Sequence, residues 1–439
     1  MKHQLKKVLG VGFGIAVVIG GTIGVGILRT PGDIAALIPS HWPILLCWLL
    51  GGLYTLVAAS SYAELTTMLP KAGGSYNYIK RAFGEYAGFL SGWFDYITNA
   101  IAPAYFCIVL SEYTSLIFPQ LAIPPTLISI GFLTLFTLIH IPGIKSASVL
   151  QQVTSAIKII LFLLLIAACF IWGGTAHGRI NENTAATGLF RGSMLIAVFK
   201  AFQLIIGTYD GWMSVSFFAE ENANPENVIP KSYFLGAITV LSLYVLINAA
   251  VLYVLPVTAI GKSPLAVADA AGVVFGAGGT MFIRVFALFS LVSILNAYMM
   301  IPARILFGLS RDGFFFKKGA VINKGGTPVV ALLCSFIFSF FLIVFSSFNQ
   351  LFSLAAFMMV VITGLAYASV IKLRKSEPHL PRPYLAAGYP YSTYLTLLVT
   401  LALFIGFGLG DPTSLLVISG IAGLSWLLYR LFVKRPILN

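Results

Sequence analysis

Charged residues are scarce in this sequence of 439 residues. Asp, Glu, Lys and Arg together make up 9% of the chain, whereas hydrophobic residues make up 59%. Soluble domains carry about 25% charged residues, so this chain has too little polar material to cover a water-facing surface. The composition also excludes a disordered chain, which needs low hydrophobicity. The sequence therefore predicts a protein that is largely embedded in a lipid bilayer.

Cysteine and histidine are also rare, and their positions exclude several kinds of chemistry. The four cysteines lie inside apolar segments without a Cys-x-x-Cys pair, and the five histidines are scattered without a His-Glu-x-x-His motif. A disulfide framework, a metal site and a bound cofactor are therefore not expected. Because an intramembrane enzyme would need clustered His, Asp, Glu or Cys side chains, we do not expect an enzyme.

Long apolar segments are abundant, and they predict the fold class. A transmembrane helix needs about 20 apolar residues, whereas the strands of a membrane barrel alternate between apolar and polar residues. The continuous apolar segments therefore predict an all-α polytopic membrane protein. Its twelve predicted helices cover residues 9–38, 43–68, 84–117, 122–140, 145–172, 192–219, 232–256, 278–309, 327–346, 350–372, 390–409 and 413–433.

Positive charge exceeds negative charge, with 27 Lys and Arg against 14 Asp and Glu. In membrane proteins such an excess collects in cytoplasmic loops, so it need not indicate nucleic-acid binding. With these helices and a cytoplasmic N-terminus, 20 of the 27 lie on the cytoplasmic side, 5 lie outside, and Lys158 and Lys200 lie within helices. We therefore expect a multi-pass protein of the plasma membrane whose termini, residues 1–8 and 434–439, are cytoplasmic.

Two of the predicted helices are interrupted near their middle. Four glycines lie between residues 20 and 26, and each costs a helix interior roughly 1 kcal/mol relative to alanine. The second interruption, Gly207 to Trp212, contains the intramembrane Asp210. Either cluster alone could serve only close helix packing. However, helices one and six are where a transporter with inverted five-helix repeats has its broken helices.

This spacing predicts two five-helix repeats, residues 9–172 and 192–372, followed by two further helices in residues 390–433. A half-helix that starts after a break exposes N–H groups that suit a carboxylate, and the carbonyls before the break suit an ammonium. Two such breaks can bind both ends of an α-amino acid. The predicted substrate-binding residues are Ile23, Gly24, Val25, Gly26 and Ile27 at the first break, and Gly207, Thr208, Tyr209, Asp210 and Gly211 at the second.

Lys158 lies at the midpoint of the fifth predicted helix, where an isolated charge costs roughly 2.5–3.5 kcal/mol. Gln151, Thr154 and Ser155 are at helical spacing from it, so these side chains form a polar stripe that should face the interior of the bundle. Neither end of the helix is within reach of the ammonium. We therefore expect Lys158 to have a functional role.

Several motifs resemble those of the amino acid–polyamine–organocation superfamily. They are Gly21-Thr22-Ile23-Gly24-Val25-Gly26-Ile27, Pro70-Lys71-Ala72-Gly73-Gly74-Ser75-Tyr76 with Phe83-Gly84, and Glu220-Glu221 followed by Pro225 and Pro230. Tyr209-Asp210-Gly211-Trp212 is similar to a motif of its L-type amino acid transporter family, as are Arg304, Ser310-Arg311-Asp312-Gly313 and Arg382-Pro383. The resemblance implies a LeuT-like fold of five plus five inverted helices with two extra ones, and sodium-independent exchange of amino acids.

The resemblance also implies roles for particular residues. Sodium-coupled relatives hold an ion between helices one, five and eight, and the Lys158 ammonium would replace that ion. It would then contact carbonyls near Gly20 and Gly21, and Ser293 or nearby groups on helix eight. Trp212 and Tyr244 are candidates for gating, and Pro70–Gly74 is a candidate inner gate. Asp210 leaves three roles open: binding a cationic substrate side chain, capping the second half-helix, or pairing with Lys158 or Lys200.

Animal members of that family are linked to a heavy chain through a cysteine between helices three and four. The corresponding loop here, residues 118–125, contains no cysteine. We therefore expect a monomer without a disulfide-linked heavy chain. The expected function is sodium-independent exchange of small neutral L-amino acids, such as alanine, serine and cysteine. A proton-coupled amino-acid symporter and an antiporter of cationic amino acids or polyamines remain open as alternatives.

Overall fold

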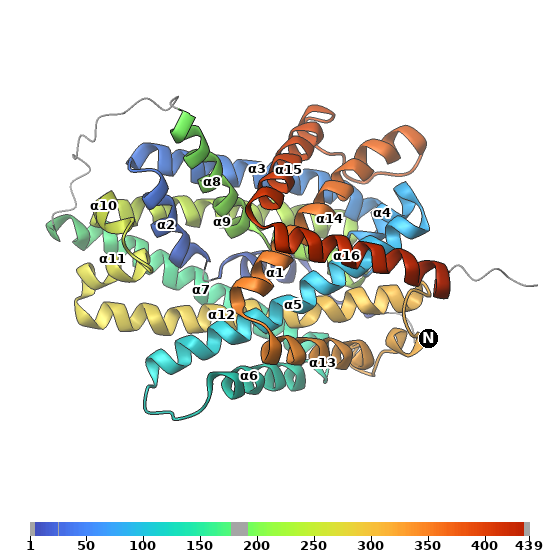
Figure 1. Ribbon diagram of the computed structural model, residues 1–439, viewed down its shortest axis with the longest axis horizontal. Helices are drawn as coiled ribbons and strands as arrows, with labels where there is room; N and C mark the ends of the chain where they lie inside the picture. Colours follow the sequence, from blue (N-terminus) through green and yellow to red (C-terminus); the bar gives the residue numbers. More distant parts are fainter. Residues whose placement is uncertain (1–4, 25, 177–191, 434–439) are drawn as a thin grey trace, which may run out of the picture.

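The computed structural model describes residues 5–24, 26–176 and 192–433, which form a bundle of helices (Figure 1). In this part of the chain, eight helices are long and apolar enough to cross a membrane. They are α3 (His41–Met68), α5 (Glu85–Ile117), α7 (Ile144–Trp172), α9 (Pro225–Val254), α12 (Ala277–Arg311), α14 (Phe348–Ser376), α15 (Tyr391–Gly410) and α16 (Pro412–Leu428). A ninth candidate is the pair α1 (Val11–Thr22) and α2 (Gly26–Leu37), which are bent by 45°.

Shorter helices complete the bundle and its loops. The apolar ones are α6 (Pro125–His140), α8 (Gly192–Tyr209), α11 (Ala266–Phe275) and α13 (Val329–Phe345). The others are α4 (Tyr76–Phe83), α10 (Val257–Ile260) and the segments η1 (Gly173–Ala176), η2 (Trp212–Glu221), η3 (Lys317–Ala320) and η4 (Tyr429–Val433). The helical membrane fold is therefore confirmed, and each of the twelve predicted spans coincides with a helix or with an interrupted helix.

The exact number of membrane crossings and the inverted repeats remain predictions. The helices α6 and α13 have 16 and 17 residues, so at 1.5 Å per residue they are only about 25 Å long. A bilayer core is about 30 Å thick. Length and composition alone therefore do not identify these two helices as complete spans.

The largest difference from the predicted boundaries is the start of α9. Residues 225–231 contain Glu226, Asn227, Lys231 and two prolines, so hydropathy predicts the start of this helix at residue 232. The helix begins instead at Pro225, directly after Asn224. Proline is favoured at the first position of a helix because its missing N–H would have no partner there. The helix thus extends almost two turns beyond its apolar segment.

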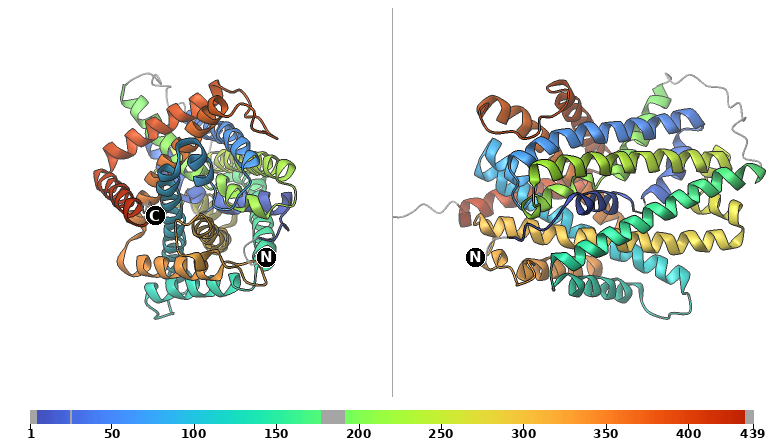
Figure 2. Two further views of the ribbon diagram at one scale, coloured as in Figure 1. Left: turned by 90° about the vertical axis from the view of Figure 1, so that its right-hand side faces the viewer. Right: turned by 180° about the vertical axis from the view of Figure 1, so that it is seen from behind.

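The first helix lies in the middle of the bundle. It packs against α7, α9, α12 and η2, and nine of its twelve residues are buried (Figure 2). The last two long helices, α15 and α16, pack on the outside of α14 (Figure 1). Their surfaces are mostly exposed and apolar, as expected for helices that face lipid. The first interrupted helix thus begins inside a scaffold formed by the others.

Ion pairs gather at the end of the bundle where the described chain begins. They are Lys80–Asp312, Arg81–Glu377, Arg304–Glu221, Arg311–Glu220 and the pairs of Glu64 with Arg374 and Arg382. The segment before α1 is also attached here, because the N–H groups of Val8 and Leu9 both donate to the carbonyl of Glu221, at 3.0 and 2.9 Å. This end of the bundle is therefore closed by ionic and main-chain contacts.

One of the buried acids in these pairs, Glu64, also accepts a hydrogen bond from a main-chain N–H group. Its carboxylate accepts two hydrogen bonds from Arg374, at 2.9 and 2.6 Å, and one from the N–H of Ala386 at 2.7 Å. The Glu64 side chain is only 2% exposed. Glu64 thus joins α3 to α14 and to the loop before α15.

Replacing Glu64 by glutamine should destabilise the protein markedly. Glu64→Gln leaves a partly buried guanidinium without its counter-charge, and breaking one side of a buried pair costs about 3–5 kcal/mol. Because Arg374 is 21% exposed, water can solvate part of its charge, so we expect about 3 kcal/mol. The free energy of unfolding in detergent, measured by denaturant titration, tests this expectation.

Glu377→Gln is the matched control for this measurement. The Arg81 guanidinium lowers the pKa of Glu377 by a hydrogen bond and by its charge, but both side chains are partly exposed. Such pairs contribute at most about 1 kcal/mol, present above the unfolded pKa and lost as the pH falls through the lowered pKa. Equal effects of the two substitutions would contradict a structural role for the burial of Glu64.

Candidate functional site

The first helix break lies between Thr22 and Gly26. The main chain of Ile23 is extended, with φ −78° and ψ 98°, so α1 ends there. Ile23 and Ile27 are both fully buried. Val25, which was predicted to bind substrate, lies outside the described residues. The break is thus found where the glycine-rich sequence predicted it.

The second break follows Tyr209, the last residue of α8. Gly211 has φ +104°, a conformation that residues with a side chain rarely adopt, and η2 begins at Trp212 as a 3-10 helix. The turn is therefore formed by Asp210 and Gly211. A left-handed glycine ends the helix here, as glycines do at many helix C-termini.

The two breaks touch through their main chains. A Cβ atom placed on Gly211 would lie less than 3.0 Å from the carbonyl oxygen of Gly21 and 3.0 Å from the N–H nitrogen of Thr22. Conversely, a Cβ atom on Gly21 would lie 3.3 Å from the carbonyl oxygen of Gly211. Only glycine at residue 211 allows this approach. The predicted Gly21 thus holds the breaks together rather than contacting Lys158.

Tyr244 of α9 links the two breaks as well. Its hydroxyl lies 3.0 Å from the carbonyl oxygen of Thr22 and 3.2 Å from that of Thr208. Its ring packs against Tyr209, with centroids 4.9 Å apart, and Tyr209 donates to the carbonyl of Trp48. A third link is the hydrogen bond between Thr30 of α2 and Thr208 of α8, at 2.9 Å. Side chains from three helices therefore hold α1, α2 and α8 in register.

Lys158 reaches the first break from α7. Its ammonium nitrogen lies 2.5 Å from the carbonyl oxygen of Ile23, and its side chain is fully buried. Ser290 of α12 donates to the same carbonyl, at 3.2 Å. Ile23 lies beyond the last residue of α1, so its carbonyl is available to these donors. Helices α1, α7 and α12 thus meet at one oxygen atom.

The groups found around Lys158 lie close to those expected. Its partner is the carbonyl of Ile23, two residues after Gly21 and just beyond the end of α1. The hydroxyl of Ser293 is buried without a partner among the described residues, and Ser290, one helical turn earlier, takes the predicted place. Gly20 packs against Gln151, whose amide donates to the carbonyl of Ala16 at 3.1 Å. Gly20 is therefore a packing glycine.

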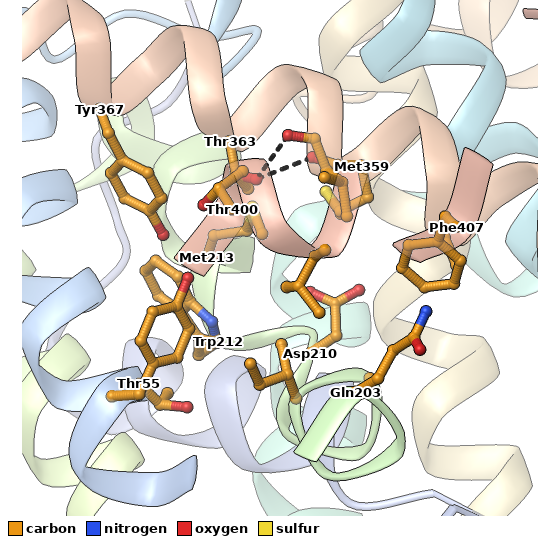
Figure 3. A pocket seen from close by; sticks show the side chains of 16 residues that line it. Thr55, Gln203, Asp210, Trp212, Met213, Met359, Thr363, Tyr367, Thr400 and Phe407 are labelled. Carbon is orange, nitrogen blue, oxygen red and sulfur yellow. Dashed lines mark hydrogen bonds between the residues drawn. The ribbon is translucent and has the colours of Figure 1, made fainter. Parts of the chain in front are cut away.

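Two cavities adjoin the second break and share four lining residues, Gly207, Asp210, Ala356 and Met359. The larger cavity, of about 70 Å³, is walled mainly by α3, α8, α14 and α15, with Trp212 and Met213 of η2 (Figure 3). The smaller cavity, of about 50 Å³, lies between α5, α8, α12 and α14. A Cβ atom on Gly207 would meet nothing within 4 Å, so this glycine faces open space.

Asp210 lines both cavities. Within the described part of the chain it forms no ion pair, and Lys158 contacts Ile23 instead. Of the three roles left open for Asp210, pairing with Lys158 or Lys200 is thus not seen among the described residues. Asp210 directly precedes Gly211 at the turn, and a capping role for it stays a prediction. The carboxylate is also available to a ligand in either cavity.

The described residues of the first break, Ile23, Gly24, Gly26 and Ile27, are not among the lining of either cavity. A Cβ atom on Gly24 would lie 3.1 Å from the side chain of Ile294, and one on Gly26 would lie 3.2 Å from Thr208. Sequence reasoning also missed the polar wall of the smaller cavity: Thr98 and Tyr105 of α5 and Tyr298 of α12. Thr98, Ala102 and Tyr105 follow helical spacing, which is the signal that could have found them.

Comparisons with known proteins agree with this geometry. A family model described as amino acid permease matches residues 14–425. The serine/threonine exchanger SteT of Bacillus subtilis is 28% identical over 404 residues, which cover 90% of each chain. The b(0,+)-type amino acid transporter 1 of Mus musculus is 26% identical, over 87% of this chain and 78% of its own. The human large neutral amino acids transporter small subunit 2 is 28% identical, over 86% and 72%.

Gly211→Ala tests the contact between the breaks. The substitution forces a side chain into the left-handed region, at about 1–2 kcal/mol, and against the Gly21 carbonyl. We expect the free energy of unfolding to fall by roughly 2 kcal/mol or more. Gly207→Ala is the matched control, because its new methyl group meets open space, and it should change stability by less than about 1 kcal/mol. A Gly211→Ala protein as stable as Gly207→Ala would contradict this packing.

Proposed function

Because the chain belongs to the amino acid permease family, in the amino acid–polyamine–organocation superfamily, we propose that it is a sodium-independent exchanger of small neutral L-amino acids. It is a membrane-embedded amino-acid transporter, and its relatives include exchangers. We propose alanine, serine and cysteine as substrates, moved by alternating access. The observation that carries sodium independence is the buried Lys158 ammonium on the carbonyl of Ile23.

The charge of Lys158 and its contact with the Ile23 carbonyl both disfavour a sodium ion at this place. A cation site between α1, α7 and α12 needs oxygen atoms that have no other partner. Here the carbonyl oxygen of Ile23 already accepts from the Lys158 ammonium and from Ser290. A sodium ion would bring a second positive charge beside a buried lysine, without a carboxylate in contact with either. The ammonium therefore makes a sodium requirement unnecessary.

The substrate is proposed to bind at the two breaks. The N–H groups that begin α2, at Gly26 and Ile27, suit its carboxylate, and the carbonyls that end α8 suit its ammonium. The small cavity beside Gly207 would take the side chain, and its volume of about 50 Å³ favours small ones. Since Ile294 and Thr208 cover the first break, binding requires these helices to separate. Such a movement is inherent in alternating access.

The assembly is proposed to be a monomer in the plasma membrane with both termini in the cytoplasm. One relative is named as a small subunit. In this chain, the loop between α5 and α6 contains no cysteine, and the four cysteines are buried or half-buried without a disulfide. A partner linked by a disulfide is therefore not expected here.

A specific observation favours a second candidate, the antiport of cationic amino acids or polyamines. The carboxylate of Asp210 lines both cavities, and no lysine or arginine pairs with it in the described residues. A cationic side chain or amine could supply the missing charge. Proton-coupled symport, the other alternative, can be distinguished from exchange by the uptake assay described next.

Exchange should be visible in proteoliposomes. Uptake of labelled alanine into vesicles loaded with alanine should be at least tenfold faster than into empty vesicles, and choline should replace sodium without loss. A dependence on a sodium gradient would contradict the proposal. Stimulation by an inward proton gradient would favour symport, and competition by arginine or putrescine, but not by serine, would favour the cationic alternative.

Lys158→Ala should depress transport unequally on the two sides of the membrane. The substitution leaves the Ile23 carbonyl with one donor fewer, at about 1–3 kcal/mol for a buried polar group. If this contact stabilises one orientation of the transporter by about 1.4 kcal/mol more than the other, its loss changes the ratio of their populations tenfold. Lys158→Arg should rescue poorly, because a planar guanidinium is not a compact point charge. Apparent affinities measured from each side of oriented vesicles test this.

Lys200→Ala is the matched control, since this lysine lies on α8 but is exposed. It should transport like the unchanged protein. If Lys158→Ala and Lys200→Ala transport equally well from both sides of the membrane, Lys158 has only a structural role.

A further inference from the structure

The larger cavity has no role in the proposed amino-acid site. Its separate walls are α3 and α15, whereas the smaller cavity has α5 and α12 (Figure 3). The shared residues, Asp210 and Gly207 of the second break with Ala356 and Met359 of α14, form the boundary between them. A ligand in the larger cavity would therefore lie behind the break and touch it through Asp210.

Three of the five hydroxyl groups that line this cavity belong to threonines and present oxygen lone pairs. Thr55 donates to the carbonyl of Gly51 at 2.9 Å, and Thr400 donates to that of Thr396 at 2.7 Å. Thr363 donates to the carbonyl of Met359 at 3.0 Å, a bond drawn in Figure 3. Each threonine hydroxyl has a single proton, and it is already used within its own helix, so the side of its oxygen that faces the cavity is an acceptor. The other two hydroxyls, of Tyr54 and Tyr367, can accept as well as donate.

The cavity also contains a carboxylate that forms no ion pair within the described part of the chain. Asp210 points into it, and its 16 lining residues include no lysine, arginine or histidine (Figure 3). Trp212, Tyr367 and Phe407 add aromatic rings. A carboxylate in largely apolar surroundings favours a positive partner, and aromatic faces attract organic cations. A ligand with several N–H donors and a positive charge matches this lining.

The volume limits the size of such a ligand. About 70 Å³ holds roughly five water-sized groups, at 10–15 Å³ for each. We propose that the larger cavity is a second ligand site, which binds a small organic ammonium ion and is separate from the amino-acid site. Because the bound ion would connect Asp210 to α14 and α15, it should hinder movement of the second break. Such a ligand inhibits transport without competing with the amino acid.

Direct binding to the full chain tests the site independently of any transport activity. The probe is propylammonium, and propan-1-ol is its neutral counterpart with the same number of non-hydrogen atoms. Isothermal titration calorimetry on the protein in nanodiscs should show saturable binding of propylammonium and none of propan-1-ol at the same concentrations. Millimolar alanine should not displace the ion.

Variants separate the two cavities. The double change Thr363→Val and Thr400→Val removes two acceptors from the larger cavity and should weaken propylammonium binding at least tenfold. Thr98→Val changes only the smaller cavity, and Thr239→Val removes an exposed hydroxyl that also donates within its own helix. Both controls should bind within twofold of the unchanged protein. If the double variant does not fold, Gln203→Leu is the second variant: it removes the amide oxygen that α8 contributes to the lining of the larger cavity, and it should also weaken propylammonium binding.

Three results would overturn the proposal. Absence of saturable propylammonium binding would show a cavity that holds only water. Equal binding of propan-1-ol would remove the role of charge. Displacement by alanine, or equal weakening by Thr98→Val, would place the ion in the amino-acid site. Calorimetry measures binding without transport, so each of these results could still be interpreted if the protein proved not to be an exchanger.

Discussion

The structure depends on the contact between two interrupted helices deep in the bundle. A main-chain break inside a membrane protein leaves carbonyl and N–H groups that no water can reach, so the protein must supply their partners or a ligand must. Here the carbonyl of Gly21 lies against Gly211, Tyr244 reaches carbonyls on both sides, and Lys158 holds that of Ile23. The long helices around α1 are the scaffold that holds these contacts together in the described structure. The N–H groups at the start of α2 are the complementary donors, and they are proposed to bind the substrate.

The opposite requirement acts at the end where the described chain begins. There the helix ends are joined by side chains of opposite charge, and the segment before α1 pairs with the end of η2. The partly exposed pair of Arg311 with Glu220 can open and close at small net free energy, because its charged groups regain water when they separate, whereas the buried pair of Arg304 with Glu221 is costly to break. In the proposed alternating access, the exposed pairs are therefore the contacts at this end that can separate most readily.

The positions of the helices and of both breaks could be predicted from the sequence, because long apolar segments form membrane helices and clustered glycines weaken them. The exact partner of Lys158 could be predicted only to within a few residues, since it depends on the residue at which α1 ends, and the carbonyl of Ile23 just beyond that end takes the contact. The roles of individual glycines could not be predicted from the sequence either. Gly20 accommodates Gln151, whereas Gly207 opens a cavity, and both look alike in a sequence. The walls of the smaller cavity come mainly from α5, α12 and α14. Only the packing of these helices shows that Thr98, Tyr105 and Tyr298 lie together.

The central claim is that main-chain groups at the two breaks hold the amino acid, with its side chain in the smaller cavity. A density map of the protein in nanodiscs with saturating alanine tests this most directly. The account predicts density for the carboxylate at the N–H groups of Gly26 and Ile27, and density for the methyl group beside Gly207. Alanine bound in either cavity without contact to the start of α2 would contradict it.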